Sequence, residues 1–465
     1  MRLFFTSILI AISWALSAQD STLTLPLAEY LGYVKAYHPF VKQANLVINE
    51  SEAKLMKARG AFDPKLEVDY DRKKFKNTEY YDKLNASFKI PTWFGIELKG
   101  NFEENTGDFL NPQDVVPIDG LYSAGISIPV ARGLLTNERM AMLRQSRLYV
   151  KQAQADRQLL VNDILYEATI TYFNWLKSYN EKRIFEDFLS NAQMRFEGIK
   201  KSHDVGERPA IDTLEARITI NNRKLNLEKA RINYIKASLE LSNYLWLQDI
   251  PIEITNTIIP DTHTIHAVDA ILNTSGLDLE SFNLDNHPKL QALDYKLQSL
   301  TIDKRLKQNN LLPQIDLQYQ FLSQTPELAR SFNTSAYKSG VNISFPIFLR
   351  KERGDLRLAH IKLQDTKFDI QSTKLSLKNK MDAVLQELDS YQNQNTYIAQ
   401  IVNDYSSLLE AEERKFTLGE SSLFLVNSRE STLIDTKLKA VEIENSYFNT
   451  KAKLFNVLGT ANVDY

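Results

Sequence analysis

The chain has 465 residues and a formal net charge of −2, with 56 basic and 58 acidic side chains. This balance argues against a nucleic-acid-binding protein, because such proteins carry an excess of basic residues on one surface. The absence of cysteine excludes disulfides, thiol nucleophiles, sulfur-ligated metal sites and a lipidated N-terminal cysteine. The length alone is typical of about three domains, but an internal duplication points to two similar halves.

Residues Met1–Ala18 have the pattern of a secretory signal peptide. Arg2 precedes an apolar segment, which is followed by the small residues Ala15, Ser17 and Ala18. We expect cleavage after Ala18, with Ser17 as the other option and a short buried N-terminal helix as the alternative interpretation. No later segment approaches the about 20 consecutive apolar residues of a membrane-spanning helix. The mature protein is therefore expected to be exported, and strands would make any contact with a membrane.

One stretch of the chain occurs twice. The first copy begins HPFVKQANLV at His38 and the second begins HPKLQALDYK at His287, and the two align without a gap. Pro64 in the first copy corresponds to Pro313 in the second. Each copy predicts a helix of about six turns, then a proline, then a strand in which apolar and polar residues alternate. Proline suits this junction because it ends a helix and is tolerated at the start of a strand.

The two predicted strands each have one apolar and one polar face. In the first, Leu66 and Val68 alternate with acidic residues; in the second, Ile315 and Leu317 alternate with acidic and amide residues. An acid–base cluster is one interpretation of these carboxylates, and the lining of a water-filled channel is the other. We expect a polar face that lines a lumen and consists of Glu67, Asp69, Asp71, Asp316 and Gln318.

Further alternating runs follow the first copy, so that barrel strands are expected within residues 65–129 and 315–346. Pro129 and Pro346 close these two regions, at GISIP and GVNISFP, and form helix–strand junctions like Pro64 and Pro313. The first region also contains an extra hairpin, Leu84–Phe102, which turns at PTWFG. The sequence leaves open whether this hairpin enlarges a barrel or lies against it.

Two long segments without glycine or proline predict unusually long helices. They run from Leu134 to Glu197 and from Asp355 to Leu418, and apolar residues recur in both at steps of four and three, the coiled-coil pattern. Each continues through a turn into a returning helix, which gives helical hairpins over residues 134–250 and 355–458. Shorter helices stacked end to end match the long ones, so we expect four columns of about 95 Å. Residues 251–286 would form a linking belt at mid-height.

These elements define a first repeat over residues 19–250, a linker over 251–286 and a second repeat over 287–465. A sheet that spans lipid has to close, because every backbone amide and carbonyl needs a partner inside the protein. The strands of one chain are too few for closure, and coiled-coil helices need neighbours on both sides. A ring of identical chains satisfies both requirements.

At this point the chain resembles the TolC-like outer-membrane efflux proteins. The likeness rests on the paired HP helices, the strand exits at Pro129 and Pro346, and two tip turns, VGERPAID and LGESSLFL. It covers essentially the whole mature chain, and the order and duplication of the motifs are its specific part. The resemblance implies an α+β membrane protein: a homotrimeric outer-membrane β-barrel of about twelve strands, continuous with a long periplasmic α-helical coiled-coil barrel, in two tandem structural repeats.

The same resemblance implies partners and a passive role. The tips would dock onto a periplasmic adaptor protein and an inner-membrane pump, and the cargo would be drugs, metal ions or exported protein. The protein would be a duct of a tripartite efflux or type I secretion system and not an enzyme; the sequence offers no phosphate-binding glycine loop, nucleophile elbow or metalloprotease helix. An extended coiled-coil surface adhesin or scaffold is the alternative, but it leaves the alternating strands unexplained.

The tip turns are predicted around Gly206 and Gly419. In the family, acidic residues narrow the closed aperture; Asp212 in the first turn fits this pattern, whereas the second turn has Leu425 and Ser428 at the corresponding places. One interpretation is an apolar constriction and the other is simple packing between helices, in both cases made by Leu423, Phe424 and Leu425.

Histidines raise the only question of a metal site. His263 and His266 lie near Asp261 and Asp269, but two histidines in an unsupported loop are more often solvated side chains, so no metal or other cofactor is expected. His38 and His287 precede helical prolines at equivalent places, which predicts a structural role as helix caps.

Overall fold

The computed structural model describes residues 23–255, 257–262, 267–272, 274, 283–325 and 334–459. The expected signal peptide and the pair His263 and His266 lie outside these residues. The chain divides into two compact units, composed of Met1–Val41, Asn162–Asp278 and Met381–Asn462, and of Lys42–Val161, Leu279–Lys380 and Val463–Tyr465. Each unit is described by itself.

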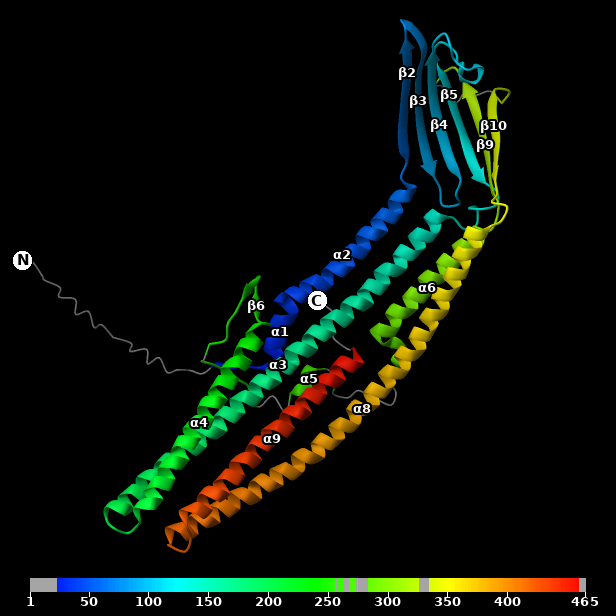
Figure 1. Cartoon of the computed structure of the whole chain (residues 1–465). Coiled ribbons are helices and arrows are strands. Elements are labelled where there is room, and N and C mark those ends of the chain that lie inside the picture. Colours follow the sequence, from blue (N-terminus) through cyan, green and yellow to red (C-terminus); the bar gives the residue numbers. More distant parts are fainter. Residues whose placement is uncertain are drawn as a thin grey trace, which may run out of the picture. The chain divides into compact units, whose positions relative to one another are not determined.

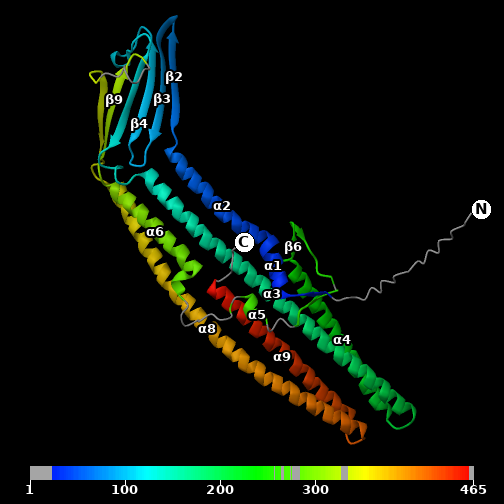
Figure 2. The same ribbon diagram turned by 180° about the vertical axis from the view of Figure 1, so that it is seen from behind.

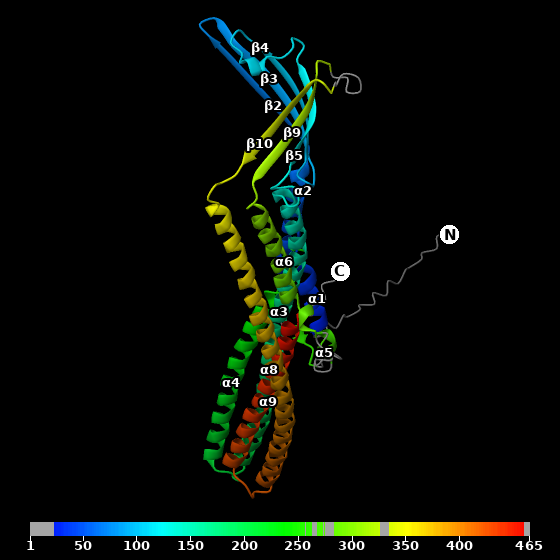
Figure 3. The same cartoon turned by 90° about the vertical axis from the view of Figure 1, so that its right-hand side faces the viewer.

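The second unit contains an antiparallel sheet of six strands (Figures 1 and 3). Its order is β10-β9-β5-β4-β3-β2, and every pair of neighbours is antiparallel. Alternating apolar and polar residues favour these strands, as expected for a sheet with two different faces. The strands are β2 (Lys65–Phe75), β3 (Thr78–Pro91), β4 (Glu97–Thr106), β5 (Leu121–Pro129), β9 (Gln314–Ser323) and β10 (Tyr337–Ser344).

The extra hairpin forms part of this sheet. Strands β3 and β4 lie between β2 and β5, so the hairpin is inserted into the sheet and does not lie against it. Its turn is closed by hydrogen bonds between the Thr92 amide and the Ile96 carbonyl (2.8 Å) and between the Gly95 amide and the Thr92 carbonyl (3.3 Å). Gly95 has φ of +78°, a conformation that glycine adopts without steric cost. The described part of one chain therefore contributes six strands to this sheet.

Helices of the second unit adjoin this sheet in the chain (Figure 2). Helix α2 (Pro39–Arg59) precedes β2, and α6 (Pro288–Asn309) precedes β9. The first part of α3 (Glu138–Asp204) contacts both, because the Arg157 side chain donates to Asn45 (2.6 Å) and the Gln145 amide donates to the Ser299 carbonyl (3.1 Å). Among the described residues, the first part of α8 (Arg350–Thr417) is a further helix of this unit.

The first unit is built around the remaining parts of α3 and α8. They pair with α4 (Ala210–Ser242) and α9 (Leu423–Leu458). One apolar core joins α3, α8 and α9 through Phe188, Leu409, Val426, Leu433 and Ile434, and a smaller one joins α3, α4 and α9 through Ile199, Ala216 and Leu423. Helix α4 ends at Ser242 and not at Ile250 as expected, because the chain turns there into a two-stranded sheet, β6 (Trp246–Leu247) with β7 (Ile250–Pro251).

Smaller elements complete the first unit. Helix α1 (Leu27–Tyr37) packs Tyr30 against Tyr172 of α3, with ring centroids 5.6 Å apart. Strand β1 (Leu23–Leu25) pairs with β8 (Ile258–Pro260), and α5 (Val268–Ile271) follows. No helix in the described part of the chain has both the length and the apolar character needed to cross a membrane.

The prediction that the two HP histidines cap helices is confirmed. The His287 Nδ1 atom accepts from the Lys289 amide (3.1 Å) at the start of α6, and the His38 Nδ1 atom accepts from the Phe40 amide (3.3 Å) at the start of α2. A cap of this kind satisfies an amide that has no partner within the helix. Both rings are buried, and His38 stacks on Tyr244 at 5.5 Å.

His38 should make stability depend on pH. Burial lowers the pKa of His38, partly offset by a hydrogen bond with the Asn243 backbone. The pKa of His38 in the folded protein lies below the unfolded value of about 6.5, so the folded state favours the neutral ring. The contribution of neutral His38 to the free energy of unfolding is therefore complete above pH 6.5 and is lost as pH falls through the folded pKa. The variant His38→Asn keeps a capping side chain but does not titrate in this range. Its unfolding temperature should therefore fall less than that of the wild type between about pH 7 and pH 5.

The measurement is thermal unfolding of the purified protein across that pH range. The matched control is His360→Asn, because His360 is exposed on α8 and should leave the wild-type pH dependence intact. Equal pH dependence in the His38→Asn variant and the wild type would contradict the assignment.

Candidate functional site

The five predicted lumen-lining residues share one face of the sheet. In an antiparallel pair, residues directly opposite each other project to the same side. Asp69 lies opposite Asn85 on β3, and Gln318 lies opposite Ser127 on β5. The same register continues across all six strands, so these side chains form one polar surface, which we call the polar face. Its members include Glu67, Asp69, Asp71, Ser87, Asn101, Ser127, Asp316, Gln318 and Asn342.

The polar face also carries lysines that the sequence analysis did not single out. Lys65, Lys89 and Lys99 are opposite one another across three neighbouring strands, and Lys83 lies opposite Asp71. Lys89 forms an ion pair with Glu67, which ties β2 to β3. The sequence did contain a pattern that indicates this position, because lysines alternate with apolar residues in β3 and β4. The face is therefore mixed in charge, which favours a wet surface over an acid–base pair of carboxylates.

The opposite face of the sheet is apolar and exposed. Rows of apolar residues cross it in register, for example Ile90, Leu98, Ile126 and Tyr319. The edge strands contribute exposed side chains as well, including Leu66, Val68, Val341 and Ile343. Burying apolar surface is the main favourable term in folding and association, so a face of this size exposed in one chain calls for an apolar environment.

The four predicted junction prolines lie where strands meet helices. Pro64 immediately precedes β2 and Pro313 immediately precedes β9; Pro129 is the last residue of β5, and Pro346 follows β10. The Pro313 carbonyl accepts from the Arg132 amide (3.1 Å), which joins the end of α6 to the segment before α3.

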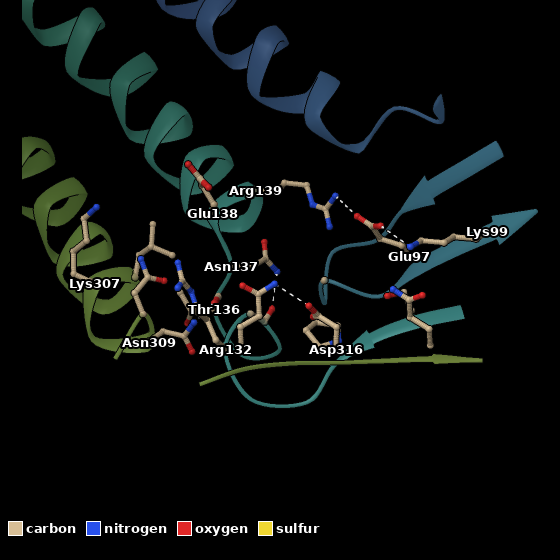
Figure 4. Close-up of a pocket in the computed structure, with 18 residues that line it drawn as sticks. Glu97, Lys99, Arg132, Thr136, Asn137, Glu138, Arg139, Lys307, Asn309 and Asp316 are labelled. Carbon is tan, nitrogen blue, oxygen red and sulfur yellow. Dashed lines mark hydrogen bonds and ion pairs between the residues drawn. The ribbon is translucent and has the colours of Figure 1, made fainter. Parts of the chain in front are cut away.

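A polar cavity of about 450 Å³ lies at this junction, where the polar face meets α3 and α6. Figure 4 shows the Glu97 carboxylate between Arg139 and Lys99, at 3.0 and 4.0 Å. Asp316 and Gln318 of the predicted lining reach the cavity from β9. Asn137 caps the start of α3 through its side-chain oxygen, which accepts from the Met140 amide (2.8 Å).

The first tip turn lies between α3 and α4. Gly206 has φ of +81°, and nothing lies within 4 Å of the position that a Cβ atom would take, so glycine is needed here for its backbone conformation alone. Arg208 organises the turn: its guanidinium lies 4.0 Å from the Phe416 ring centroid of α8 and 3.5 Å from the carboxylate of Asp212. Asp212, the acidic residue that fits the family pattern, is thus held by an ion pair with Arg208.

The second tip turn separates the three apolar residues that were expected to act together. Gly419 has φ of +78°, and Ser422 caps α9 by accepting from the Leu425 amide (3.4 Å). Leu423 is buried and packs against Ile199 and Ala216, which is packing between helices. Phe424 is 68% exposed and Leu425 is 40% exposed, and Ser428 is exposed one turn later. A constriction would therefore involve only the exposed pair.

A buried cluster of charges links the four helices near the tips. Glu430 of α9 is fully buried, and its two carboxylate oxygens accept from Arg195 of α3 (3.0 Å) and Arg223 of α4 (3.2 Å). Arg195 also donates to Glu413 of α8 (2.7 Å). No sequence pattern described above predicted this cluster. Its signal was a glutamate at an apolar position of the α9 seam, which runs Leu423, Val426, Glu430 and Leu433 at steps of three, four and three.

The described residues contain no group of three His, Asp or Glu side chains arranged to bind a metal. Asp269, which the sequence placed near the two histidines, forms an ion pair with Lys451 of α9 at 2.5 Å.

Residues 281–460 match the family model described as outer membrane efflux protein. Three solved structures are similar to the chain over 93% of its length. The Campylobacter jejuni CmeC outer membrane channel has 14% identity, 85% of its own chain covered and a TM-score of 0.63. VceC, an outer membrane protein of Vibrio cholerae, has 13% identity, 96% covered and a TM-score of 0.64. The open state of the Neisseria gonorrhoeae MtrE outer membrane channel has 12% identity, 88% covered and a TM-score of 0.64.

At these identities the likeness establishes a shared fold. A search among curated proteins finds no relative that matches. The chain thus combines the fold of these outer membrane proteins with the sequence signature of the efflux family in its second half.

Proposed function

We propose that the chain is a passive exit duct of a tripartite efflux or type I secretion system, because residues 281–460 match the family model described as outer membrane efflux protein. The observation that supports this most is the six-stranded sheet, which has one polar face and one exposed apolar face, and whose two edge strands have no outer neighbour within the described part of the chain. A sheet of this kind suits a wall between water and lipid. The sheet would lie in the outer membrane and the helices in the periplasm.

The open edges support assembly into a ring. Among the described residues, β2 pairs only with β3, and β10 only with β9. Because the number of antiparallel strands is even, the two edge strands run in opposite directions. When copies of the chain stand side by side, β10 of one can therefore pair antiparallel with β2 of the next, and the ring closes as one antiparallel sheet. Three chains would join eighteen strands, six from the described part of each, and not the about twelve that the resemblance implied. The backbone radius would be about 18 Å instead of about 12 Å, a wider outlet.

The helices support the same assembly. Helix α8 has an exposed apolar stripe at heptad spacing, which consists of Leu358, Ile361, Phe368 and Leu375. A stripe at this spacing packs against a neighbouring helix in a coiled coil. In a homotrimer, α8 would find that neighbour in the adjacent chain, and the helices would enclose a tunnel.

The tips would be the docking point for a periplasmic adaptor and an inner-membrane pump, which supplies the energy. Exposed apolar side chains at both turns suit such contact, namely Val205, Ile211, Leu418 and Phe424. Opening would need the tip hairpins to splay, and a partner that binds the open form better would favour that state. The cargo class remains drugs, metal ions or exported protein. A surface adhesin or scaffold offers no role for the two-faced sheet.

The decisive experiment is purification of the full chain in detergent, followed by planar-bilayer recording. We expect an SDS-resistant, heat-modifiable trimer that conducts ions. A stable monomer without a pore would contradict the proposal, whatever the identity of the pump.

Leu425→Asp tests the tip. Leu425 is partly exposed next to Phe424, so three carboxylates at a narrow entrance should raise cation selectivity and single-channel conductance, because they attract cations and remove an apolar constriction. Planar-bilayer recording with a salt gradient measures both. Leu239→Asp, at another exposed leucine on α4, is the control and should behave as the wild type. Unchanged selectivity and conductance in Leu425→Asp would remove the exposed pair from the gate.

A further inference from the structure

A basic groove runs between α3 and α6, just after the strands end. Its volume is about 490 Å³, and its lining contains four cationic side chains and no acidic one. Leu148 and Ile302 supply apolar surface between them. The four cations that define the groove are Arg144, Arg147, Lys151 and Arg305.

These cations have no anionic partner in the part of the chain that the structure describes. All four are exposed, and two of them, Arg144 and Lys151, lie over aromatic rings. The Arg144 guanidinium lies 5.3 Å from the Trp93 ring centroid, and the Lys151 ammonium lies 5.9 Å from that of Tyr295. Four like charges within one groove repel one another, so an anion bound among them would relieve that repulsion.

The groove lies on the side of the helices away from the junction cavity. Side chains are about 100° apart along a helix, so Lys307, which lines the junction cavity, is about 200° around α6 from Arg305. On α3, Arg139 of the cavity is about 140° from Arg144 of the groove. Because the cavity belongs to the polar face, the groove belongs to the side of the apolar face.

Aromatic residues mark the boundary between that apolar face and the groove. Trp93 lies in the turn between β3 and β4 and stacks on Phe62, with ring centroids 5.8 Å apart. Phe94, the next residue, is exposed. Tryptophan and phenylalanine at the end of an apolar band are typical of a membrane–water interface. Arg147 and Lys151 follow Arg144 about 4.5 and 10.5 Å further along α3, which is the depth of lipid headgroups when the sheet lies in a membrane as proposed above.

We propose that this groove binds the phosphate of an anionic phospholipid from the inner leaflet of the outer membrane. The cations hold the phosphate, and Leu148 and Ile302 contact the apolar part of the same lipid. The inference rests on the proposed position of the sheet in that membrane. Charge complementarity and continuity with the apolar face select a lipid over a soluble anion.

The test uses the purified assembly in neutral detergent with equal amounts of phosphatidylglycerol and phosphatidylcholine. Native mass spectrometry counts the lipids that stay bound. We expect the wild type to retain phosphatidylglycerol preferentially, and Arg147→Glu with Lys151→Glu to reduce that preference at least about tenfold. Arg147→Lys with Lys151→Arg keeps the charges and should keep the preference.

The matched control is Lys296→Glu with Lys367→Glu, which makes the same change in net charge at exposed sites outside the groove and should retain the lipid. Unchanged preference in the groove variant, or equal retention of both lipids by the wild type, would overturn the inference. Complete displacement by excess inorganic phosphate would assign the groove to a soluble anion instead. Trimer formation and conductance are measured on the same samples, so that their loss reports on the proposed function and not on the lipid.

Discussion

Glu430→Gln is expected to lower the free energy of unfolding by about 3–5 kcal/mol. Glu430 is the buried anion between Arg195 and Arg223, whose side chains are only 14% and 8% exposed. Removing its charge leaves the two buried guanidinium groups without the negative charge that offsets their desolvation. A buried charge without such a partner in a low-dielectric interior costs several kcal/mol. The measurement is equilibrium or thermal unfolding of the helical signal, which should shift to lower temperature.

Glu413→Gln is the matched control for this prediction. Glu413 binds the same Arg195 at 2.7 Å but is 45% exposed, so water replaces it and the loss should stay within about 1 kcal/mol. If the two variants lost equal stability, burial of Glu430 would not be the cause of its effect. Because the cluster joins α3, α4, α8 and α9, the Glu430→Gln variant should also show faster proteolysis near both tip turns.

Gly125→Ala is expected to prevent correct pairing of β5 with β9. A Cβ atom at Gly125 would lie 2.1 Å from the Tyr319 carbonyl oxygen and 2.5 Å from the Gln320 Cα. These are backbone atoms, which cannot rotate away as a side chain does, so the two strands must separate. We expect a loss of at least about 3 kcal/mol, the upper part of the range for overpacking. Heat-modifiable trimer recovered from membranes measures the outcome.

Gly340→Ala on β10 separates this effect from a general intolerance of alanine in the sheet. Nothing lies within 4 Å of the Cβ position at Gly340, and its φ is not in the left-handed region, so the variant should assemble as the wild type. Equal behaviour of the two alanine variants would contradict the close approach of β5 and β9.

Local patterns determined a large part of the architecture. The long helices follow from the absence of glycine and proline between Leu134 and Glu197, and the tip turns follow from Gly206 and Gly419. The two faces of each strand follow from alternation, because successive side chains point to opposite sides. The capping role of His38 and His287 was also readable, since both precede a proline at the first helical position.

Contacts between distant segments were beyond the reach of these patterns. Alternation shows that residues 84–102 form strands, but whether they join β2 and β5 depends on backbone pairing between elements. The burial of Glu430 depends on Arg195 and Arg223, which lie more than two hundred residues away in the chain. The separation of buried Leu423 from exposed Phe424 needed the position of Ile199 on a different helix.

The sequence by itself determined the order of helices and strands, the polar and apolar side of each, and the match of residues 281–460 to the family model described as outer membrane efflux protein. Only the tertiary structure decided that the sheet has six strands, that lysines share its polar face, and that a charge cluster and a basic groove exist. The physical reason is range: helix and strand patterns repeat every two to four residues, whereas register, burial and charge compensation arise where remote segments meet.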